Sequence, residues 1–431
     1  MNGTKAKKRL VSWVLPAERL TERQRRVLVL VALASMASAF INTLFTQTVA
    51  FAADEFDVST TAQGFGAAVV RFGIVICLPI VMFADKRGRR PMIIAVAWAA
   101  PIISALGAFA PSFPVLVATQ TVGRPLGLTL DILVAIIAIE EMPRNSRAYA
   151  TGLLAVVSGA GAGVAVASLP LADTGTQGWR IVYLVSLVWL IVAAVLTRWL
   201  PESQRFTDHS LRTSSQPKVR GARRRHLGEH LWRICSVVFL TNLYIATTSI
   251  FQNRYLKDVR GYSALGVALF TVATSSPASL GLIIGGRVAD ERGRRVLGAT
   301  MVPLGAILFA ASFAVGGGAM WAFAIAGALA FGMSYPAMAV YRGELFPTSV
   351  RGLAGGLIMT SSLVGGSIGL VGAGRALDAG SSYGTVMMLL VAGPLAASLM
   401  VWKRYPETAH LSLEEITDVH PRETSEPNPP R

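Results

Sequence analysis

Long apolar runs dominate this chain and constrain its fold more than any other feature. Twelve of them approach the length of about 20 residues that an α-helix needs to cross the hydrocarbon core of a bilayer. None alternates apolar and polar residues as the strands of a membrane barrel do. We therefore predict an all-α membrane protein with twelve transmembrane helices. The runs lie at 27–53, 60–84, 91–110, 113–139, 149–170, 180–200, 234–256, 263–289, 296–316, 319–342, 352–376 and 383–402.

The composition agrees with a membrane protein and excludes several other classes. Hydrophobic residues make up 53% of the chain and charged residues 15%, where a soluble domain carries about 25% charged residues. Cys77 and Cys235 are too few for a disulfide framework. Neither a metal-ligand cluster nor a glycine-rich nucleotide loop with lysine occurs. We expect no cofactor, no metal and no enzymatic activity.

The positive charge lies between the apolar runs, which points to membrane topology rather than to nucleic acid. The formal net charge is +16. With the amino terminus placed inside, 32 Lys and Arg residues fall in inside segments and 5 in outside loops. Cytoplasmic loops carry such an excess of Lys and Arg. We predict a multi-pass protein of the cell membrane with both termini cytoplasmic, and no nucleic-acid partner.

Composition also divides the chain into five segments. The stretch between the sixth and seventh runs is rich in Arg, Ser and Gln, which is typical of a linker. The predicted segments are a basic amino terminus at 1–26, a six-helix bundle at 27–200, a cytoplasmic linker at 201–233, a second six-helix bundle at 234–402 and a cytoplasmic tail at 403–431.

Four patterns recur at an offset of 204 or 205 residues, which indicates an internal repeat. Chance matches would not share an offset, so we infer two homologous six-helix halves in parallel. In transporters built from such repeats the substrate site lies between the halves near mid-membrane. The pairs are Asp85-x-x-Gly88-Arg89-Arg90 with Asp290-x-x-Gly293-Arg294-Arg295, Glu140-x-x-Pro143-x-x-x-Arg147 with Glu344-x-x-Pro347-x-x-x-Arg351, Gly152-x8-Gly161 with Gly356-x8-Gly365, and Pro201-Glu202-Ser203 with Pro406-Glu407-Thr408.

These motifs resemble those of the major facilitator superfamily, and within it the branch of sugar-porter-like, metabolite:proton symporters. The sequence from Glu344 to Gly352, Glu-Leu-Phe-Pro-Thr-Ser-Val-Arg-Gly, matches that branch closely. The first copy of the loop motif departs from the family, with Val81 where the family has glycine. The resemblance implies the major facilitator fold and a secondary active transporter that works by alternating access.

The repeated charged motifs are interpreted as a gating latch. The resemblance implies that their acidic and basic side chains pair at the cytoplasmic helix ends, and such pairs can form in one state and break in the other. The alternative is that the arginines serve only as topology signals. The latch residues are Asp85, Gly88, Arg89, Glu140, Arg147, Glu202, Asp290, Gly293, Arg294, Glu344, Arg351 and Glu407.

Three charged residues lie within predicted helices, where each costs about 2.5–3.5 kcal/mol on insertion scales. They are Arg71, Arg124 and Asp131. Asp131 follows Arg124 by seven positions, so the two share a helix face. In the family the fourth-helix arginine, which Arg124 resembles, interacts with a protonatable Asp on the first helix. The first helix of this chain has no acidic residue before Asp54 and has Asn42 at its middle. We predict that Asp131 and Arg124 couple transport to protons; the alternative is a structural Asp–Arg ion pair.

Polar residues on several helices are candidates for binding substrate, although a single residue of this kind is more often a helix-contact residue. The seventh helix lacks the paired Gln that sugar transporters of this branch use, which disfavours a hexose. The substrate-binding candidates are Asn42, Gln47, Arg71, Asn242, Tyr244, Gln252 and Tyr335.

The predicted function is proton-coupled transport of a small organic metabolite. Two arginines against one aspartate in the amino half favour an organic anion. The alternative is a proton-driven exporter of a drug or natural product. A membrane sensor would need a folded cytoplasmic domain, and residues 201–233 and the tail are too short and polar for one. The expected partners are a small-molecule substrate, protons and the lipid bilayer, with the protein acting as a monomer.

Overall fold

The computed structural model describes residues 20–143, 146–202, 221–344, 346 and 348–407. Within these ranges the chain is helical and holds twelve helices long and apolar enough to cross a membrane. The predicted all-α fold with twelve spans is therefore confirmed. Several side chains are outside the description, namely those of Leu78, Asp85, Lys86, Arg147, Ala148, 221–227, Asp290, Val340, 342–344 and 348–353.

The first six spans follow one another with short connections. Some consist of an α-helix continued by a 3-10 segment. Their elements are α2 (Glu22–Glu55), α3 (Thr60–Phe72) with η1 (Gly73–Ile76) and α4 (Cys77–Arg87), α5 (Arg89–Leu106) with η2 (Gly107–Phe109), α6 (Phe113–Glu141), α7 (Arg147–Ala167) with η4 (Leu169–Thr174), and α8 (Gly178–Leu184) with η5 (Val185–Trp189) and α9 (Leu190–Trp199).

The second six spans repeat this order. The seventh span ends in a π-helical turn, and the twelfth is interrupted at Val391. Their elements are α11 (Gly221–Arg254) with η6 (Tyr255–Val259), α12 (Ala264–Arg292), α13 (Arg294–Ala311), α14 (Gly317–Glu344), α15 (Thr348–Asp378), and α16 (Tyr383–Leu390) with α17 (Ala392–Arg404).

Local chemistry sets the helix ends that hydrophobicity leaves open. The apolar run predicts a first helix from 27, but α2 begins at Glu22. Thr21 and Gln24 form a capping box there, in which the Thr21 hydroxyl accepts from the Gln24 N–H at 3.3 Å and Gln24 Oε1 accepts from the Thr21 N–H at 3.0 Å. Reciprocal bonds of this kind satisfy N–H groups that a helix start leaves unbonded. The helix therefore extends beyond its apolar run.

The helices fall into two compact units. The first holds residues up to 215 together with 249–269, and the second holds 216–248 and the residues from 270 onward. The last residues of α11, from Ser249, thus cluster with the first unit, while the bundle boundaries at 200 and 234 remain a prediction. The predicted segments at 1–26, 201–233 and 403–431 lie largely outside the described residues.

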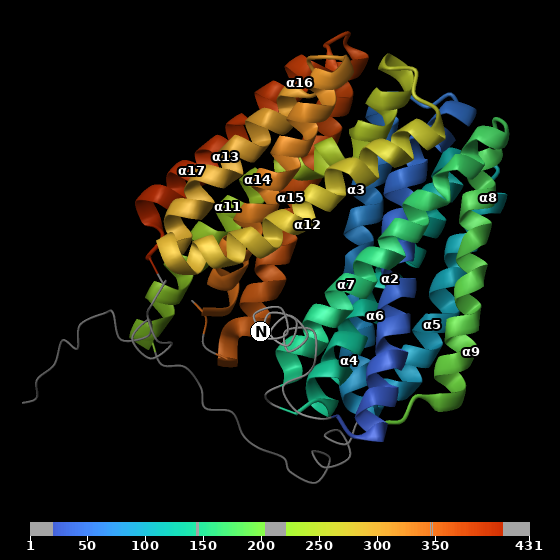
Figure 1. Ribbon diagram of the computed structural model, residues 1–431, viewed down its shortest axis with the longest axis vertical. Helices are drawn as coiled ribbons and strands as arrows, with labels where there is room; N and C mark the ends of the chain where they lie inside the picture. The colour runs from blue at the N-terminus through green and yellow to red at the C-terminus, as the bar shows by residue number, and fades with distance from the viewer. Residues whose placement is uncertain (1–19, 144–145, 203–220, 345, 347, 408–431) are drawn as a thin grey trace, which may run out of the picture. The chain divides into compact units, whose positions relative to one another are not determined.

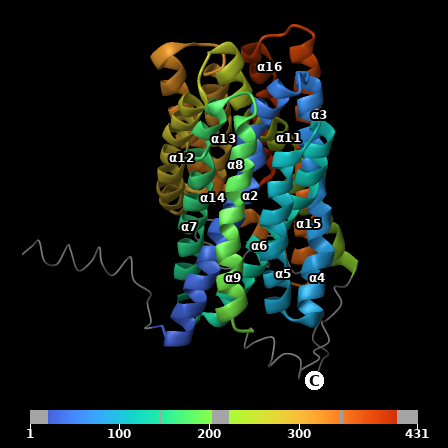
Figure 2. The same cartoon turned by 90° about the vertical axis from the view of Figure 1, so that its right-hand side faces the viewer.

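In the first unit, α2 packs between α6 and α7, as both views show (Figure 1, Figure 2). Small residues allow this close approach. A Cβ on Gly161 of α7 would collide with the Met36 carbonyl oxygen of α2, and one on Gly127 of α6 would lie 3.0 Å from the Ile41 side chain. Glycines at such contacts let helix backbones come together in membranes. The contacts fix the level at which α2 faces each neighbour.

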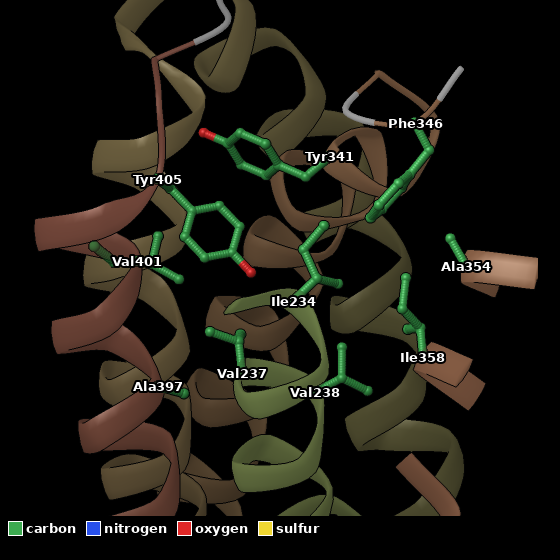
Figure 3. Close-up of a cluster of buried hydrophobic side chains, with 11 residues drawn as sticks. Ile234, Val237, Val238, Tyr341, Phe346, Ala354, Ile358, Ala397, Val401 and Tyr405 are labelled. Carbon is green, nitrogen blue, oxygen red and sulfur yellow. The ribbon is translucent and has the colours of Figure 1, made fainter. Parts of the chain in front are cut away.

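In the second unit, a buried cluster joins α11, α14, α15 and α17 (Figure 3). The rings of Tyr341 and Tyr405 lie 4.9 Å apart at 75°, an edge-to-face contact that aromatic pairs prefer. The Tyr341 hydroxyl donates to the Pro406 carbonyl at 3.0 Å. The cluster therefore ties the end of the last span, close to Glu407, to the middle of α11 at Ile234, Val237 and Val238.

Candidate substrate and coupling site

The helix α6 carries both charged residues on which the sequence prediction depends. Arg124 and Asp131 are half-buried and separated by about 10.5 Å of helix rise. Pro125 lies inside this helix. Because proline has no N–H, the Thr121 carbonyl loses its usual helical donor. At this level Gly73 packs directly against Thr121, and a Cβ there would collide with the Thr121 carbonyl oxygen.

The parallel contact between α3–α4 and α6 places Arg71 near Arg124. Gly73 meets Thr121, and the Cys77 thiol donates to the Pro125 carbonyl at 3.0 Å. Both contacts have an offset of 48 residues, which puts Arg71 level with residue 119. Arg71 therefore lies about 7.5 Å of rise from the level of Arg124. The two guanidinium groups are close enough for their charges to repel each other.

Arg124 is not neutralised by a carboxylate of the part of the chain that the structure describes. No ion pair forms there within 4 Å of its guanidinium, and its buried Nε has no hydrogen-bond acceptor. A buried cation without a partner is costly. Two positive charges in one membrane-buried region are suited to an anionic ligand with planar, bidentate groups such as carboxylates.

The antiparallel contact between α2 and α6 brings Asn42 level with Arg124. Ser35 meets Asp131, and the Ser38 hydroxyl donates to the Gly127 carbonyl at 2.8 Å. One further turn along this register pairs Asn42 with Arg124. Since Ser38 uses its only proton on Gly127, it can only accept from Asn42 Nδ2, at 3.4 Å. This orients the Asn42 Oδ1, which is buried without a donor among the described groups.

Asp131 is bonded to a serine of a neighbouring helix, Ser35 of α2, rather than to Arg124. The Ser35 hydroxyl of α2 donates to Asp131 Oδ1 at 3.2 Å, and it lies 3.1 Å from the Ser158 hydroxyl of α7. No ion pair between Asp131 and Arg124 occurs in the described residues. Asp131, Ser35 and Ser158 thus link α6, α2 and α7 through a carboxylate and two hydroxyl groups.

Another predicted residue, Gln47 of α2, is bonded to the last turn of α11. The Asn253 amide donates to both the backbone carbonyl and Oε1 of Gln47, each at 3.0 Å, and both side chains are buried. Arg254 donates to Gln63 Oε1 at 2.8 Å and to the Val58 carbonyl at 3.1 Å. Gln47 therefore holds helices together at this end of the unit.

The other substrate-binding candidates belong to α11 and α14. Tyr244 is fully buried, and its hydroxyl donates to the Ala306 carbonyl at 3.0 Å within the second unit. Asn242 donates to the Val238 carbonyl at 3.1 Å. Gln252 is half-buried, whereas Tyr335 is 63% exposed. Their role in binding substrate remains a prediction.

The repeated motifs form matching contacts in the two units. Glu202 accepts from the backbone N–H of Arg89 at 3.0 Å and of Arg90 at 3.2 Å, at the start of α5. Glu407 accepts from Arg294 at 2.9 Å and from Arg295 at 3.1 Å, at the start of α13. A carboxylate at a helix N-terminus satisfies unbonded donors and complements the helix dipole.

The glycine before each of these helices has a conformation that other residues rarely adopt. Gly88 and Gly293 both have φ of 101°. A Cβ on Gly293 would also lie 2.6 Å from a Glu407 carboxylate oxygen. The Gly-Arg-Arg pattern therefore encodes a tight turn into a capped helix as well as positive charge.

Among the predicted latch pairs, the structure describes an ion pair between Arg89 and Glu140 in the first unit. The neighbouring Glu141 lies 3.6 Å from Arg23 of α2. Each of these contacts stays within one unit. The side chains of Asp85, Arg147, Asp290, Glu344 and Arg351 lie outside the described residues.

Comparison with known proteins identifies the family. The sequence profile of the Major Facilitator Superfamily matches residues 28–370, most of the chain. The chain belongs to the Major Facilitator Superfamily. This confirms the predicted family, and the relatives below are named as transporters rather than enzymes, as the sequence predicts for this chain.

This Major Facilitator Superfamily chain is similar in sequence to a named transport protein and in structure to two solved transporters. It is 27% identical over 248 residues to the cis,cis-muconate transport protein of Acinetobacter baylyi, a match covering 53% of this chain and 58% of the relative. The inward-open xylose transporter XylE from E. coli aligns with a TM-score of 0.73 at 18% identity, over 92% of this chain and 99% of XylE. A bacterial homologue of the human lysosomal transporter Spinster aligns with a TM-score of 0.72 at 17% identity, over 89% of this chain and 97% of the homologue. These two show the shared fold.

Some residues at the site were not anticipated from the sequence. Ser35 and Ser158 are ordinary small residues of apolar helices, distinguished only by the bond of Ser35 to Asp131 and the contact of Ser158 with Ser35. Arg180, at the start of the sixth predicted span, pairs with Glu55 at 2.9 Å and donates to the Ala108 and Ala110 carbonyls, each at 2.8 Å. No local sequence pattern predicts contacts such as Ser35–Asp131 and Glu55–Arg180, whose residues lie far apart in the chain.

Proposed function

We propose that the protein is a proton-coupled secondary transporter of a small organic anion in the cell membrane. In this proposal it acts as a monomer by alternating access, with both termini in the cytoplasm. The observation that carries the proposal is the half-buried Arg124, which has no carboxylate partner among the described residues and lies within electrostatic range of Arg71. A substrate carboxylate would supply the missing negative charge.

The named relative supports the same substrate class. Muconate is a dicarboxylate, and two guanidinium groups in one region suit such an anion better than a neutral sugar. Asn42, level with Arg124, offers an additional polar contact in the same region. We assign substrate binding to Arg124, Arg71 and Asn42.

Asp131 is assigned the coupling proton. Its carboxylate has a hydroxyl partner and, among the described residues, no cation partner, so protonation would break no ion pair within that part of the chain. The bond from Ser35 also links its charge state to α2 and, through Ser158, to α7. A change of charge at Asp131 would therefore alter the hydrogen bonds that link α6 to α2 and α7, in a unit that moves during alternating access.

The repeated motifs are assigned to gating. Glu202 and Glu407 bind the backbone at the starts of α5 and α13 and so fix the position of the arginines there. These arginines follow Asp85 and Asp290 by four and five residues in the sequence. Asp290→Asn is expected to slow transport while substrate binding survives. Unchanged transport would contradict the gating role, and equal loss of binding and transport would indicate misfolding.

The substrate assignment is tested by uptake into proteoliposomes. The panel contains muconate and other mono- and dicarboxylates, neutral sugars and cationic drugs, under an imposed pH gradient. Wild-type protein should take up anions, and Arg124→Gln should raise KM about 10- to 150-fold, which corresponds to about 1.5–3 kcal/mol for a hydrogen bond to a charged group. Arg198→Gln removes an exposed arginine near the end of α9 and serves as the control. Uptake of sugars or cations without anions would refute the proposal.

A further inference from the structure

A second feature of the first unit lies outside the transport site, at the end of the bundle where α2 begins. It is a groove of about 450 Å³ between α2 and α9. Its lining combines charged and apolar side chains. They are Glu22, Arg25, Arg26, Val29, Leu30 and Trp199.

The groove carries one uncompensated positive charge. Arg25 pairs with Glu22 at 2.7 Å, which neutralises both. Arg26 is exposed and makes neither an ion pair nor a hydrogen bond with any residue that the structure describes. An anionic group entering the groove would therefore meet a cation for which the described residues supply no competing partner.

The opposite side of the groove is apolar and faces outward. Val29 is 55% exposed and Trp199 is 54% exposed. The apolar surface continues along the same span, where Val188 and Ile191 are also exposed. At 34 residues, α2 is about 51 Å long, which exceeds the roughly 30 Å hydrocarbon core, so its first turns can reach the headgroup region. Tryptophan is enriched at this boundary.

We propose that this groove binds an anionic phospholipid. Its phosphate would contact Arg26, with the Trp199 indole N–H as a second donor, and an acyl chain would lie against Val29 and the exposed face of α9. A soluble anion would use only the charged part and leave the apolar wall in contact with water or bulk lipid. Basic pockets between membrane helices hold anionic lipid headgroups in this way. The inference is independent of the proposed substrate and coupling.

Lipid retention by the purified full-length protein tests the proposal. Native mass spectrometry would compare phosphatidylglycerol with phosphatidylcholine, titrated in mixed micelles. We expect wild type to favour phosphatidylglycerol, and Arg26→Gln to weaken that preference about fivefold, the factor that one arginine near an anionic surface provides. Arg26→Lys should retain most of the preference, and Trp199→Ala should weaken binding of both lipids.

A matched control separates a site from general surface charge. Arg198 is also exposed and precedes Trp199, but it does not line the groove. Arg198→Gln should leave the preference unchanged, with size-exclusion profiles checking that every variant is folded. Equal losses in Arg26→Gln and Arg198→Gln would overturn the proposal, as would a wild type without preference. Displacement of the lipid by 10 mM inorganic phosphate would also overturn it, because the groove would then be a site for a free anion.

Discussion

Replacing Asp131 with asparagine should separate proton coupling from substrate binding. Asparagine has nearly the same shape and keeps an oxygen that can accept from the Ser35 hydroxyl, which donates to Asp131 at 3.2 Å in the wild type. It cannot carry the proton. The variant should therefore exchange substrate across the membrane but fail to accumulate it against a gradient.

The expected accumulation ratio follows from the size of the pH gradient, and the expected change in stability follows from the hydrogen bond between Ser35 and Asp131. One pH unit corresponds to about 1.36 kcal/mol, or about tenfold accumulation for a monoanion that moves with one proton at zero membrane potential. In Asp131→Asn this ratio should fall to about one. Stability should change by less than about 1 kcal/mol, because the hydrogen bond is conserved in kind. Breaking a buried ion pair with Arg124 would instead cost about 3–5 kcal/mol, but the described residues contain no such pair.

The assay compares net uptake under a pH gradient with exchange at equal pH, using the purified variant in proteoliposomes. Ser35→Ala is the matched control, since it removes the hydrogen bond and leaves the carboxylate; it should retain accumulation with an altered pH dependence. Gradient-driven accumulation that persists in Asp131→Asn would show that the proton binds elsewhere. A loss of folded protein would show that the carboxylate is needed for structure instead.

Three further outcomes are expected. Gly293→Ala should destabilise the second unit by about 1–3 kcal/mol, since the residue has φ of 101° and a Cβ would press on Glu407; thermal unfolding in detergent measures this, and an unchanged midpoint would contradict it. Arg180→Leu should cost about 3–5 kcal/mol by leaving Glu55 without its cation, whereas a midpoint equal to that of Arg198→Leu would show that the pair contributes nothing. Accessibility tags after residue 220 and at the carboxyl terminus should be cytoplasmic and one at Gly175 external; a tag on the opposite face would refute the predicted topology.

The sequence by itself determined the number of helices and most of their extents. Except at the seventh span, where α11 begins at Gly221 and the apolar run at 234, the predicted spans differ from the observed ones by only a few residues, because membrane insertion depends on local length and hydrophobicity. The family was also recognisable, since the charged motifs resemble those of the family and recur at an offset of 204 or 205 residues. The matching caps formed by Glu202 and Glu407 are the three-dimensional form of that repeat.

Only the tertiary structure decided which charged groups meet. The seven-residue spacing placed Asp131 and Arg124 on one helix face and suggested a pair, but a shared face does not bring two side chains together across two turns. The actual partner of Asp131 is Ser35, and Arg71 lies near Arg124 because glycine contacts set the level at which helices face each other. Such levels depend on interhelical packing between residues far apart in the chain. Hydrophobic periodicity within a single helix carries no information about them.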